Sequence, residues 1–410
     1  MKFYKKTVRD VPLDGRVVLI RADYNVPLTD EGKISDDYRI TQSVPTLKYL
    51  IERGCKLVIC AHLGRPDGQV KPELSLAPVA QHLSELLGRE VLFSPDCVGD
   101  GVVQMAKRLG PGAVMLLENL RFHAEEEKND EAFARQLAAD SQAEYFVQDG
   151  FGVVHRAHAS TEGVTHFLPS VSGLLLEREF TAITNAMDDP KKPLVAILGG
   201  AKVSDKIGVI KRLVEVADTI LVGGAMANTF LSYKGVNVGK SVYEPDMKAT
   251  LDEIYTAASQ KLGEGQSTDD FILLPTDVAV ATEINKDQRR QIVGVSDVHD
   301  DELILDIGPT TIEQFVAALK VAGTAIWNGT LGYAELEQFS VGSARIALQL
   351  AQAKAATTSI IGGGDTADFV LKWDEGGKGS SFSHVSTGGG ASLELMAGEK
   401  LPGIEALMNA

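Results

Sequence analysis

Short apolar runs alternate with helix-like segments along the whole chain. Runs such as Val17–Ile20, Leu57–Cys60 and Val195–Leu198 are apolar at every position, which is typical of central parallel strands covered by helices on both faces. Similar runs recur in both halves: RVVLIRAD, CKLVICAH, GAVMLLEN and AEYFVQD in the first, then PLVAILGG, DTILVGG, FILLPTDVAV, TAIWNG and TSIIGGGD in the second. The pattern predicts an α/β protein built from repeated βα units.

The segment SGLLLEREFTAITNAMDDP, residues 172–190, is predicted to form a long helix between the two halves. Its apolar residues recur at alternating spacings of four and three and so share one helical face: Leu176, Phe180, Ile183 and Met187. Ser172 is the predicted N-cap. Pro190 is predicted to end the helix, because proline cannot donate the next backbone hydrogen bond.

Length, charge and cysteine content narrow the class of protein. The 410 residues fit two domains of about 150–200 residues each. With 56 acidic and 40 basic residues the net charge is −16, so a nucleic-acid or anionic-membrane surface is not expected. Cys55, Cys60 and Cys97 lack metal or redox spacing, and we expect reduced, mostly buried thiols. The sequence has no signal-peptide core and no membrane-spanning run, which predicts a cytoplasmic protein.

Arginine and histidine residues gather in short loops of the first half. RADYNVP at 21–27 places Arg21, Asp23 and Asn25 on alternate positions, so their side chains share a face. Later loops add Arg39, His62, Arg65, Arg121, His155, Arg156 and His158. Guanidinium groups bind oxyanions bidentately and keep their charge, so the repeated pattern predicts a phosphate or carboxylate site. Any one of these arginines alone is typical of a solvated surface charge.

His155 and His158 lie three residues apart, which raises the alternative of a zinc site. No carboxylate or cysteine completes a ligand set there. We therefore expect both to be structural histidines with satisfied hydrogen bonds.

Four glycine-rich turns, each between an apolar run and a helical pattern, mark the second half: LGGAKVSDKI at 198–207, VGGAMANTF at 222–230, IIGGGDTADF at 360–369 and VSTGGGASLELM at 385–396. Glycines allow close backbone approach, and a helix N-terminus offers free N–H groups to phosphate. The first turn leads into a predicted helix that carries Lys202 and Lys206 on one face. Asp365 is the best-placed carboxylate for Mg²⁺, which prefers oxygen ligands.

Two further motifs are rejected as nucleotide signatures. GVNVGKS at 235–241 is one residue short of a P-loop and follows a helical pattern where a strand is required. GGGDTA at 362–367 matches G-x-G-x-x-A, but no acidic residue stands about 20 positions later to hold the ribose of NAD.

Together the motifs resemble the phosphoglycerate kinase family. RADYNVP, HLGRP, HRAHAST, LGGAKVSDKI, GGAMANTF, DIGPTT, WNG, GGGDTA and STGGGASLELMAG occur in that family's order, from about Arg21 to Gly403. The resemblance implies an α/β fold of two Rossmann-like lobes, each a mostly parallel sheet covered by helices on both faces, joined by a long hinge helix. It implies a monomer with four parts: a 3-phosphoglycerate domain (1–171), the hinge helix (172–190), a nucleotide domain (191–390) and a tail returning to the first domain (391–410).

The resemblance also assigns roles to residues. It implies 3-phosphoglycerate binding by Asp23, Asn25, Arg39, His62, Leu63, Gly64, Arg65, Arg121 and Arg156. It implies nucleotide binding by Gly200, Lys202, Lys206, Asn328, Glu335, Gly363, Gly364, Asp365 and Thr366, with Glu335 on the ribose and Asp365 on the magnesium ion. The implied catalytic residues are Arg39, Lys202 and Gly388. WNGTLGYAE at 327–335 departs from the family at Thr330, where proline is usual, and at Ala334, where an aromatic is usual.

The implied reaction is reversible in-line phosphoryl transfer from 1,3-bisphosphoglycerate to ADP, with Mg²⁺, in glycolysis and gluconeogenesis. Such a transfer needs in-line placement and cationic stabilisation, which we assign to Arg39 and Lys202. We expect closure about the hinge helix and the Gly388–Gly390 turn to keep water from the acyl phosphate. Two alternatives stay open: a catalytically silent sensor of metabolites or nucleotides, and an ATP-dependent kinase with another carboxylate acceptor.

Overall fold

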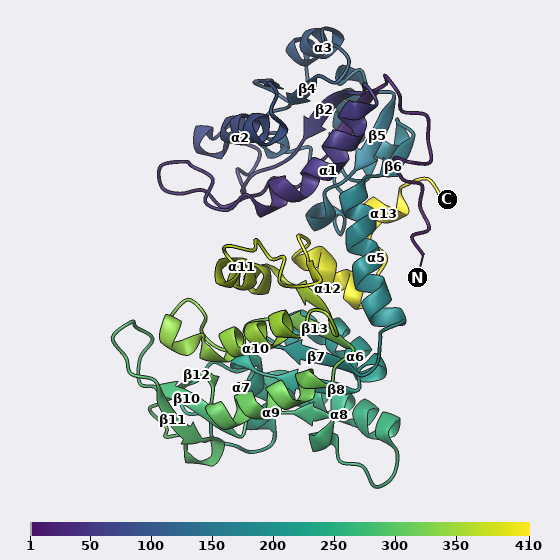
Figure 1. Cartoon of the computed structure of the whole chain (residues 1–410). Helices are drawn as coiled ribbons and strands as arrows, with labels where there is room; N and C mark the ends of the chain where they lie inside the picture. The colour runs from purple at the N-terminus through teal and green to yellow at the C-terminus, as the bar shows by residue number, and fades with distance from the viewer. Residues whose placement is uncertain (1) are drawn as a thin grey trace. The chain divides into compact units, whose positions relative to one another are not determined.

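The structure is a computed structural model that describes residues 2–410. The chain forms two compact units. The N-terminal unit comprises residues 2–181 together with residues 400–410, and the C-terminal unit comprises residues 182–399. Each unit contains a sheet with helices packed against it (Figure 1).

The N-terminal unit is built on a six-stranded sheet with strand order β3-β4-β2-β1-β5-β6, in which neighbouring strands are parallel. The strands are β1 (Val17–Arg21), β2 (Lys56–Cys60), β3 (Val91–Phe93), β4 (Val114–Leu116), β5 (Tyr145–Gln148) and β6 (Ser170–Ser172). The α-helices are α1 (Tyr38–Glu52), α2 (Ala77–Leu87), α3 (Asp100–Lys107), α4 (Glu131–Asp140), the first part of α5 (Leu174–Asp188) and α13 (Pro402–Glu405).

Alternation along the strands divides the core of this unit into two layers. Val18 packs in one layer and its neighbour Leu19 in the other, because successive side chains of a strand point to opposite faces. The first layer includes buried residues of α1 and α2, and the second includes buried residues of α3 and α4. Helices therefore cover both faces of the sheet, which is why the central strands are apolar at every position.

The C-terminal unit contains a six-stranded parallel sheet of order β15-β14-β13-β7-β8-β9 and a three-stranded antiparallel sheet of order β11-β10-β12. The strands are β7 (Leu194–Leu198), β8 (Thr219–Val222), β9 (Ile272–Leu273), β10 (Asp277–Ala281), β11 (Gln291–Gly294), β12 (Leu303–Ile307), β13 (Thr324–Asn328), β14 (Thr358–Gly362) and β15 (His384–Val385). The α-helices, beside the end of α5, are α6 (Ile207–Val216), α7 (Gly224–Tyr233), α8 (Lys248–Leu262), α9 (Pro309–Lys320), α10 (Val341–Gln352), α11 (Gly364–Trp373) and α12 (Gly390–Met396).

The predicted fold class is confirmed: two α/β units, each with a mostly parallel sheet. The run FILLPTDVAV, however, forms two strands in different sheets, β9 and β10, on either side of Pro275. Proline has no backbone N–H to donate to a sheet, so a strand cannot run through this position without losing a hydrogen bond.

The N-terminus of α5 differs from the prediction. Ser172, the predicted N-cap, lies in β6, and the helix begins at Leu174. The Asp149 carboxylate, just after β5, accepts hydrogen bonds from the N–H groups of Leu175 at 3.0 Å and Leu176 at 3.3 Å. The cap therefore comes from a residue distant in sequence, which local reading of the segment could not reveal.

Residues 400–410 pack within the N-terminal unit. The buried ammonium group of Lys5 donates to the carbonyl oxygens of Glu405 at 2.8 Å and Leu407 at 3.1 Å, and to the Asn409 side chain at 2.8 Å. Among residues 2–410, no helix combines the length and apolarity required to cross a bilayer.

Candidate functional site

The loops after β1 and β2 bring several predicted anion-binding residues of the N-terminal unit together. The Arg39 guanidinium lies 3.3 Å from the Asp23 carboxylate and donates to the Asn25 carbonyl oxygen at 2.9 Å. The Asn25 side-chain oxygen accepts from the Gly64 N–H at 2.8 Å, and the Gly64 carbonyl accepts from Arg121 at 3.0 Å. One chain of contacts thus links these five residues.

Gly64 is required at the centre of this chain. Its φ of +64° lies in the left-handed region that favours glycine, and an added Cβ would lie 2.8 Å from the Leu74 side chain. The neighbouring predicted residues differ in their surroundings. Leu63 is buried in the apolar core, whereas Arg65 is exposed.

The pKa of His62 is affected by the positive charges around it. Burial and then the charges of Arg21, Arg121, Arg39 and Arg156 hold its pKa well below the usual value. The side chain is 3% exposed, and its Nδ1 lies 3.2 Å from an Arg21 nitrogen. Since four guanidinium groups act on one buried imidazole, these arginines are gathered around His62.

Several donors in this region are available to an anion. Nε and Nη2 of Arg121 are buried and have no hydrogen-bond partner among the described residues, although Nη2 lies 3.1 Å from the Glu127 carboxylate. Arg156 is exposed. A guanidinium group with free N–H donors can bind an oxyanion without breaking an existing hydrogen bond.

The expectation of satisfied hydrogen bonds at His155 and His158 is wrong. In the described part of the chain, both Nδ1 atoms are buried without a hydrogen-bond partner. Burial is the main cause that lowers the pKa of each imidazole to about 4, with Arg156 contributing at His155 and Arg21 at His158. Both rings are therefore neutral near pH 7, because the surrounding arginines and burial oppose protonation.

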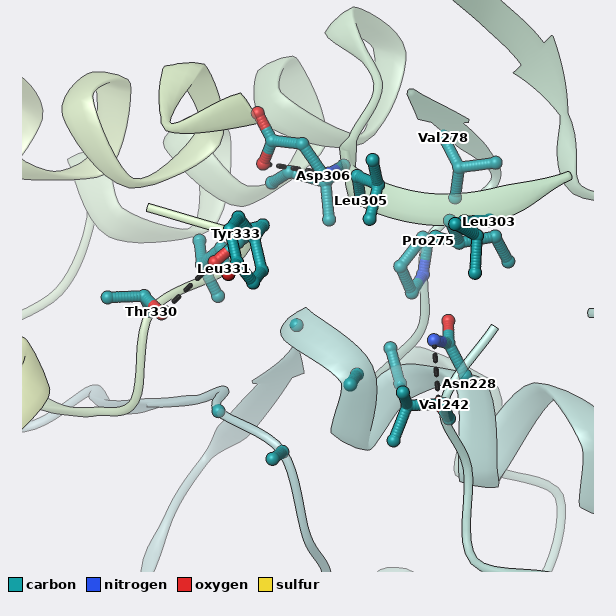
Figure 2. Close-up of a pocket in the computed structure, with 18 of the residues that line it drawn as sticks. Asn228, Val242, Pro275, Val278, Leu303, Leu305, Asp306, Thr330, Leu331 and Tyr333 are labelled. Atoms are coloured by element: carbon teal, nitrogen blue, oxygen red, sulfur yellow. Dashed lines mark hydrogen bonds between the residues drawn. The ribbon is translucent and has the colours of Figure 1, made fainter. Parts of the chain in front are cut away.

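A pocket of about 260 Å³ lies in the C-terminal unit (Figure 2). Three of the predicted nucleotide-binding residues line it: Gly200, Glu335 and Asp365. Most of the remaining wall is apolar. Three large apolar side chains in its lining are exposed, Val242 at 61%, Ile284 at 45% and Tyr333 at 38%. An exposed apolar wall of this kind suits a flat, largely apolar ligand such as a nucleobase.

Other predicted residues adjoin Gly200 through close contacts. Lys206 donates from Nζ to the Gly199 carbonyl at 2.7 Å and reaches the Asn328 carbonyl at 3.4 Å. Burial lowers the pKa of this lysine to about 8, while Asp365 acts in the opposite direction. A cation so placed, next to a glycine turn, can bind phosphate oxygens.

The turn between β14 and α11 starts at Gly363, which has a φ of +88°, and Gly364 and Asp365 form the exposed first turn of the helix. An added Cβ at Gly363 would lie 3.0 Å from Nδ2 of Asn328. That Nδ2 is buried and finds no hydrogen-bond partner within residues 2–410. The Thr366 hydroxyl is already engaged, because it accepts from the Gly329 N–H at 2.6 Å.

The prediction that one helix carries Lys202 and Lys206 on the same face is wrong. Helix α6 begins at Ile207, Lys202 lies in the preceding loop and is exposed, and Lys206 is half-buried. The Glu244 carboxylate accepts from the N–H groups of Val203 at 2.6 Å and Ser204 at 3.1 Å, which holds this segment outside the helix.

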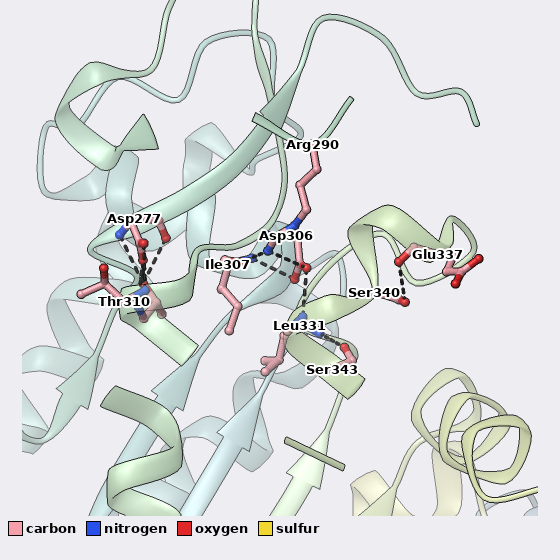
Figure 3. Close-up of polar contacts among 11 residues, drawn as sticks. Asp277, Arg290, Asp306, Ile307, Thr310, Leu331, Glu337, Ser340 and Ser343 are labelled. Carbon is pink, nitrogen blue, oxygen red and sulfur yellow. Dashed lines mark hydrogen bonds and ion pairs between the residues drawn. The ribbon is translucent and has the colours of Figure 1, made fainter. Parts of the chain in front are cut away.

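Buried ionic contacts support one side of the pocket (Figure 3). The Asp306 carboxylate accepts from the Gly342 N–H at 2.9 Å and lies 3.3 Å from the Arg290 guanidinium. Arg290 also donates to the Ile307 carbonyl at 2.7 Å. Beside them, the Leu331 N–H donates to Ser343 at 2.9 Å. Asp306, Ile307 and Leu331 all line the pocket, so these bonds fix its shape.

Gly388, a predicted catalytic residue, precedes α12, and its N–H donates to the Ser386 hydroxyl at 3.0 Å. For a metal, the exposed Asp365 carboxylate offers oxygen ligands in the pocket lining. The three cysteines are buried free thiols, as predicted. Cys97 also groups with Asp96 and His123, with ligand atoms within 4.8 Å of one another, whereas no such group contains His155 or His158 in the chain from 2 to 410.

Sequence reasoning missed much of the pocket wall. Asn228, Val242 and Ile284 line it, as do residues of β12 from Leu303 to Ile307. Asn228 lies within the quoted GGAMANTF motif, so its polar side chain in the first turns of a predicted helix was the available signal. The apolar residues of the wall gave no such signal, because an isolated apolar residue in a sequence is normally interpreted as part of the hydrophobic core.

Comparison with known proteins identifies the family of this chain. The family model described as "Phosphoglycerate kinase" matches residues 8–399. A phosphoglycerate kinase of Microcystis aeruginosa is 48% identical and the match covers 99% of this chain and 100% of the relative. A cytosolic phosphoglycerate kinase of Triticum aestivum is also 48% identical, with 98% of each chain covered.

Solved structures give the same result. Phosphoglycerate kinase from Coxiella burnetii matches with a TM-score of 0.82 at 35% identity, and that from Pyrococcus horikoshii with a TM-score of 0.82 at 33% identity. Each match covers 98% of both chains. The chain therefore belongs to the phosphoglycerate kinase family.

Proposed function

We propose that this chain catalyses the reversible transfer of a phosphoryl group from 1,3-bisphosphoglycerate to ADP, giving 3-phosphoglycerate and ATP. As a member of its family the chain is a kinase, a transferase whose acceptor is a carboxyl group. The observation that carries the proposal is the group of arginines in the N-terminal unit whose charges, after burial, lower the pKa of His62. Such a group matches the two anionic ends of a phosphorylated acid.

In this proposal the N-terminal domain, residues 1–171, binds 3-phosphoglycerate through the nine residues assigned to it above. The contacts from Arg39 through Gly64 to Arg121 support the assignment, because they fix the positions of guanidinium groups before ligand arrives. Arg65 and Arg156 are exposed, so their guanidinium groups are accessible to an anion. The proposal narrows the hinge helix from 172–190 to Leu174–Asp188 and the returning tail from 391–410 to 400–410. It extends the nucleotide domain from 191–390 to 191–399, because residues 391–399 belong to the C-terminal unit.

The C-terminal pocket binds ADP or ATP in this proposal. Its exposed apolar wall accommodates the base, Glu335 at the pocket lining holds the ribose, and the Gly363–Thr366 turn receives the phosphates. Lys206 and Nδ2 of Asn328, which has no hydrogen-bond partner among residues 2–410, lie beside that turn and supply donors for phosphate oxygens.

The donor set fits a magnesium ion brought in with the nucleotide. Asp365 is exposed, lines the pocket and carries the carboxylate oxygens that Mg²⁺ prefers. When bound, the ion would offset negative charge on the nucleotide phosphates. Asp365 would hold it, while Lys206 would neutralise oxygens that the ion does not reach.

Transfer itself needs no covalent intermediate. Arg39 and the exposed Lys202 are the cations proposed to stabilise the migrating group, and Gly388 the residue that allows the chain to bend near α12. The proposal includes a monomer located in the cytoplasm. Support for the location comes from the wheat relative, whose name includes "cytosolic".

A direct assay tests the proposed function. The chain should form ATP from ADP and 1,3-bisphosphoglycerate with Mg²⁺, and the reverse reaction should consume 3-phosphoglycerate. Calorimetry that detects 3-phosphoglycerate and ADP binding without turnover would indicate a silent sensor. Binding of another carboxylic acid in place of 3-phosphoglycerate would indicate a different kinase.

The variant Lys202→Ala tests the assigned transfer role. Because this charge acts mainly on the moving group, kcat should fall by on the order of 100-fold or more while the Kd for ADP changes little. Lys211→Ala is the matched control, since Lys211 is a lysine of the same unit that pairs with Glu253 on the surface. Equal losses in turnover and ADP affinity at Lys202 would contradict the role.

A further inference from the structure

Asn228 has an unusual position in the C-terminal pocket. It lies on α7, is 1% exposed and lines the pocket. Its Nδ2 donates to the Val242 carbonyl oxygen at 3.0 Å. Its Oδ1, in contrast, is buried and finds no hydrogen-bond partner anywhere in the described chain. A buried acceptor without a donor is costly, which suggests that a ligand supplies the missing donor.

The orientation of this amide is fixed by its partner. If the amide were turned over, Oδ1 would face the Val242 carbonyl oxygen and two acceptors would meet at hydrogen-bonding distance. The observed orientation therefore turns Oδ1 away from the Val242 carbonyl oxygen. Figure 2 shows this oxygen directed toward Pro275 and Leu303, away from Val242.

The surroundings of Oδ1 are apolar. Pro275, Val278 and Leu303 line the same end of the pocket, while Thr330 and Tyr333 lie at the other end of the view (Figure 2). Two other polar side chains in the lining, those of Asp306 and Thr330, have partners within the protein. Asp306 is held by Arg290 and Gly342, and the Thr330 hydroxyl donates to the Gly332 carbonyl at 3.1 Å. Oδ1 of Asn228 is thus an acceptor set in an apolar surface, suited to a single N–H donor.

We propose that Asn228 is a specificity-determining residue that accepts a hydrogen bond from the 6-amino group of adenine, so that this chain prefers adenine over 6-oxopurine nucleotides. The proposal rests on the proposed function, because it requires a nucleotide base in this pocket. An adenine base offers an N–H donor at its 6-position, which satisfies Oδ1. A hypoxanthine or guanine base offers a carbonyl oxygen there instead.

A 6-oxopurine base should bind more weakly than adenine for two reasons. Two oxygen acceptors would face each other, and the donor of the same amide is already engaged by Val242. A polar group desolvated without a partner loses binding free energy, and a pocket built for one donor discriminates against the analogue that lacks it. The preference should appear in KM, because the base lies far from the transferring group.

The experiment compares three nucleoside diphosphates as phosphoryl acceptors: ADP, IDP and purine riboside 5′-diphosphate, which carries no group at position 6. For the unmodified protein, kcat/KM should be higher with ADP than with IDP by about tenfold or more, with the unsubstituted purine between them. Asn228→Leu, which keeps the volume and removes the acceptor, should bring the ADP to IDP ratio within about threefold.

Asn237→Leu is the matched control, because Asn237 also donates to a backbone carbonyl, that of Val298 at 3.1 Å, and is not among the residues that line the pocket. This variant should keep the unmodified ratio. Equal kcat/KM for ADP and IDP in the unmodified protein would overturn the inference, as would a ratio that persists in Asn228→Leu. If Asn228→Leu does not fold, the order of the three nucleotides in the unmodified protein decides alone. Absence of any turnover with ADP would instead count against the proposed function.

Discussion

The protonation of Lys206 should be coupled to the binding of a phosphate group beside it. Burial lowers this pKa to about 8, so the lysine begins to lose its proton just above neutral pH in the free protein. A bound phosphate would stabilise the charged form and raise the pKa again. The nucleotide complex would then hold a proton that the free protein gives up.

The affinity for ADP should therefore fall as pH rises above about 8, by up to about tenfold per pH unit until the pKa of the complex is reached. Calorimetric Kd values across the alkaline range measure this dependence. Lys206→Met should bind ADP more weakly at neutral pH and show a flat profile above about pH 8. A slope that persists in Lys206→Met would assign the titration to another group.

The positions of single polar residues were only partly predictable. The type and loop position of Arg39 and Arg121 could be read from the sequence, because arginines recurred after several apolar runs. The actual positions of Lys202 and Lys206 could not, since Glu244, about 40 residues away in sequence, holds the intervening backbone out of the helix. Side chains whose surroundings come from distant segments escape local reading.

At the scale of elements, the glycine turn after β13 is packed against the turn after β7. Gly329 has a φ of +96°, and a Cβ there would lie 2.1 Å from the Gly199 carbonyl oxygen. Both partners are backbone, so neither can yield as a flexible side chain would. The two turns approach closely because both are glycine.

Gly329→Ala should lower the free energy of unfolding of the C-terminal unit by at least about 2 kcal/mol and weaken ADP binding, because the displaced turn includes Gly200. Denaturant unfolding and calorimetry measure the two effects. The matched control is Gly235→Ala, at φ +82°, where a Cβ would meet no heavy atom of residues 2–410 within 4 Å. That control should lose only the backbone strain, about 1 kcal/mol, and similar losses in both variants would contradict the packing argument.

The cap of α5 makes the stability of the N-terminal unit depend on pH. Burial raises the pKa of Asp149 to about 7, and within the described residues its Oδ2 is buried without a hydrogen-bond partner. Because the folded state holds a proton that the unfolded state releases above about pH 4, stability from this group falls as pH rises from about 4 to about 7.

Asp149→Asn keeps an oxygen acceptor for the helix and removes the titration. The difference in unfolding free energy between this variant and the unmodified protein should shift in favour of the variant as pH rises through that range, by up to about 4 kcal/mol. Comparing the two proteins cancels the opposite effect of His155 and His158, whose lowered pKa values favour the folded state as pH rises. A difference that is constant with pH would show that Asp149 is ionised throughout.

The elements themselves were largely predictable where strands are buried on both faces. β1, β2 and β7 were evident from the sequence because helices cover both of their faces. Their central residues, such as Val18 to Ile20 in β1, are therefore buried and apolar at every position. The shorter strands β3, β6 and β15 were not, since two or three residues carry no periodicity. β11 was missed because its residues are mostly exposed and it belongs to a small antiparallel sheet.

For the molecule as a whole, the two units should respond separately to mutation. Lys5 is 5% exposed and holds residues 405–409 by three hydrogen bonds inside the N-terminal unit. Lys5→Met should release this segment and lower the stability of the N-terminal unit by about 2–3 kcal/mol, because hydrogen bonds from a charged donor are lost.

Hydrogen exchange measures that effect region by region. Amides of residues 402–409 should exchange faster in Lys5→Met, while amides of the C-terminal unit keep their rates. Lys248→Met, at an exposed lysine of the C-terminal unit, should leave both regions unchanged. Faster exchange throughout both units in Lys5→Met would show that the chain unfolds as a single cooperative body.

Because residues 400–410 belong to the N-terminal unit, this unit is synthesised first but can complete its fold only after the whole chain has been made. A ribosome extrudes the first sheet early, then the whole of residues 182–399, and only afterwards the segment that Lys5 binds. The later unit can thus finish folding while the earlier one still lacks a part. During translation, the half that emerges first is the half that a chaperone would have to protect longest.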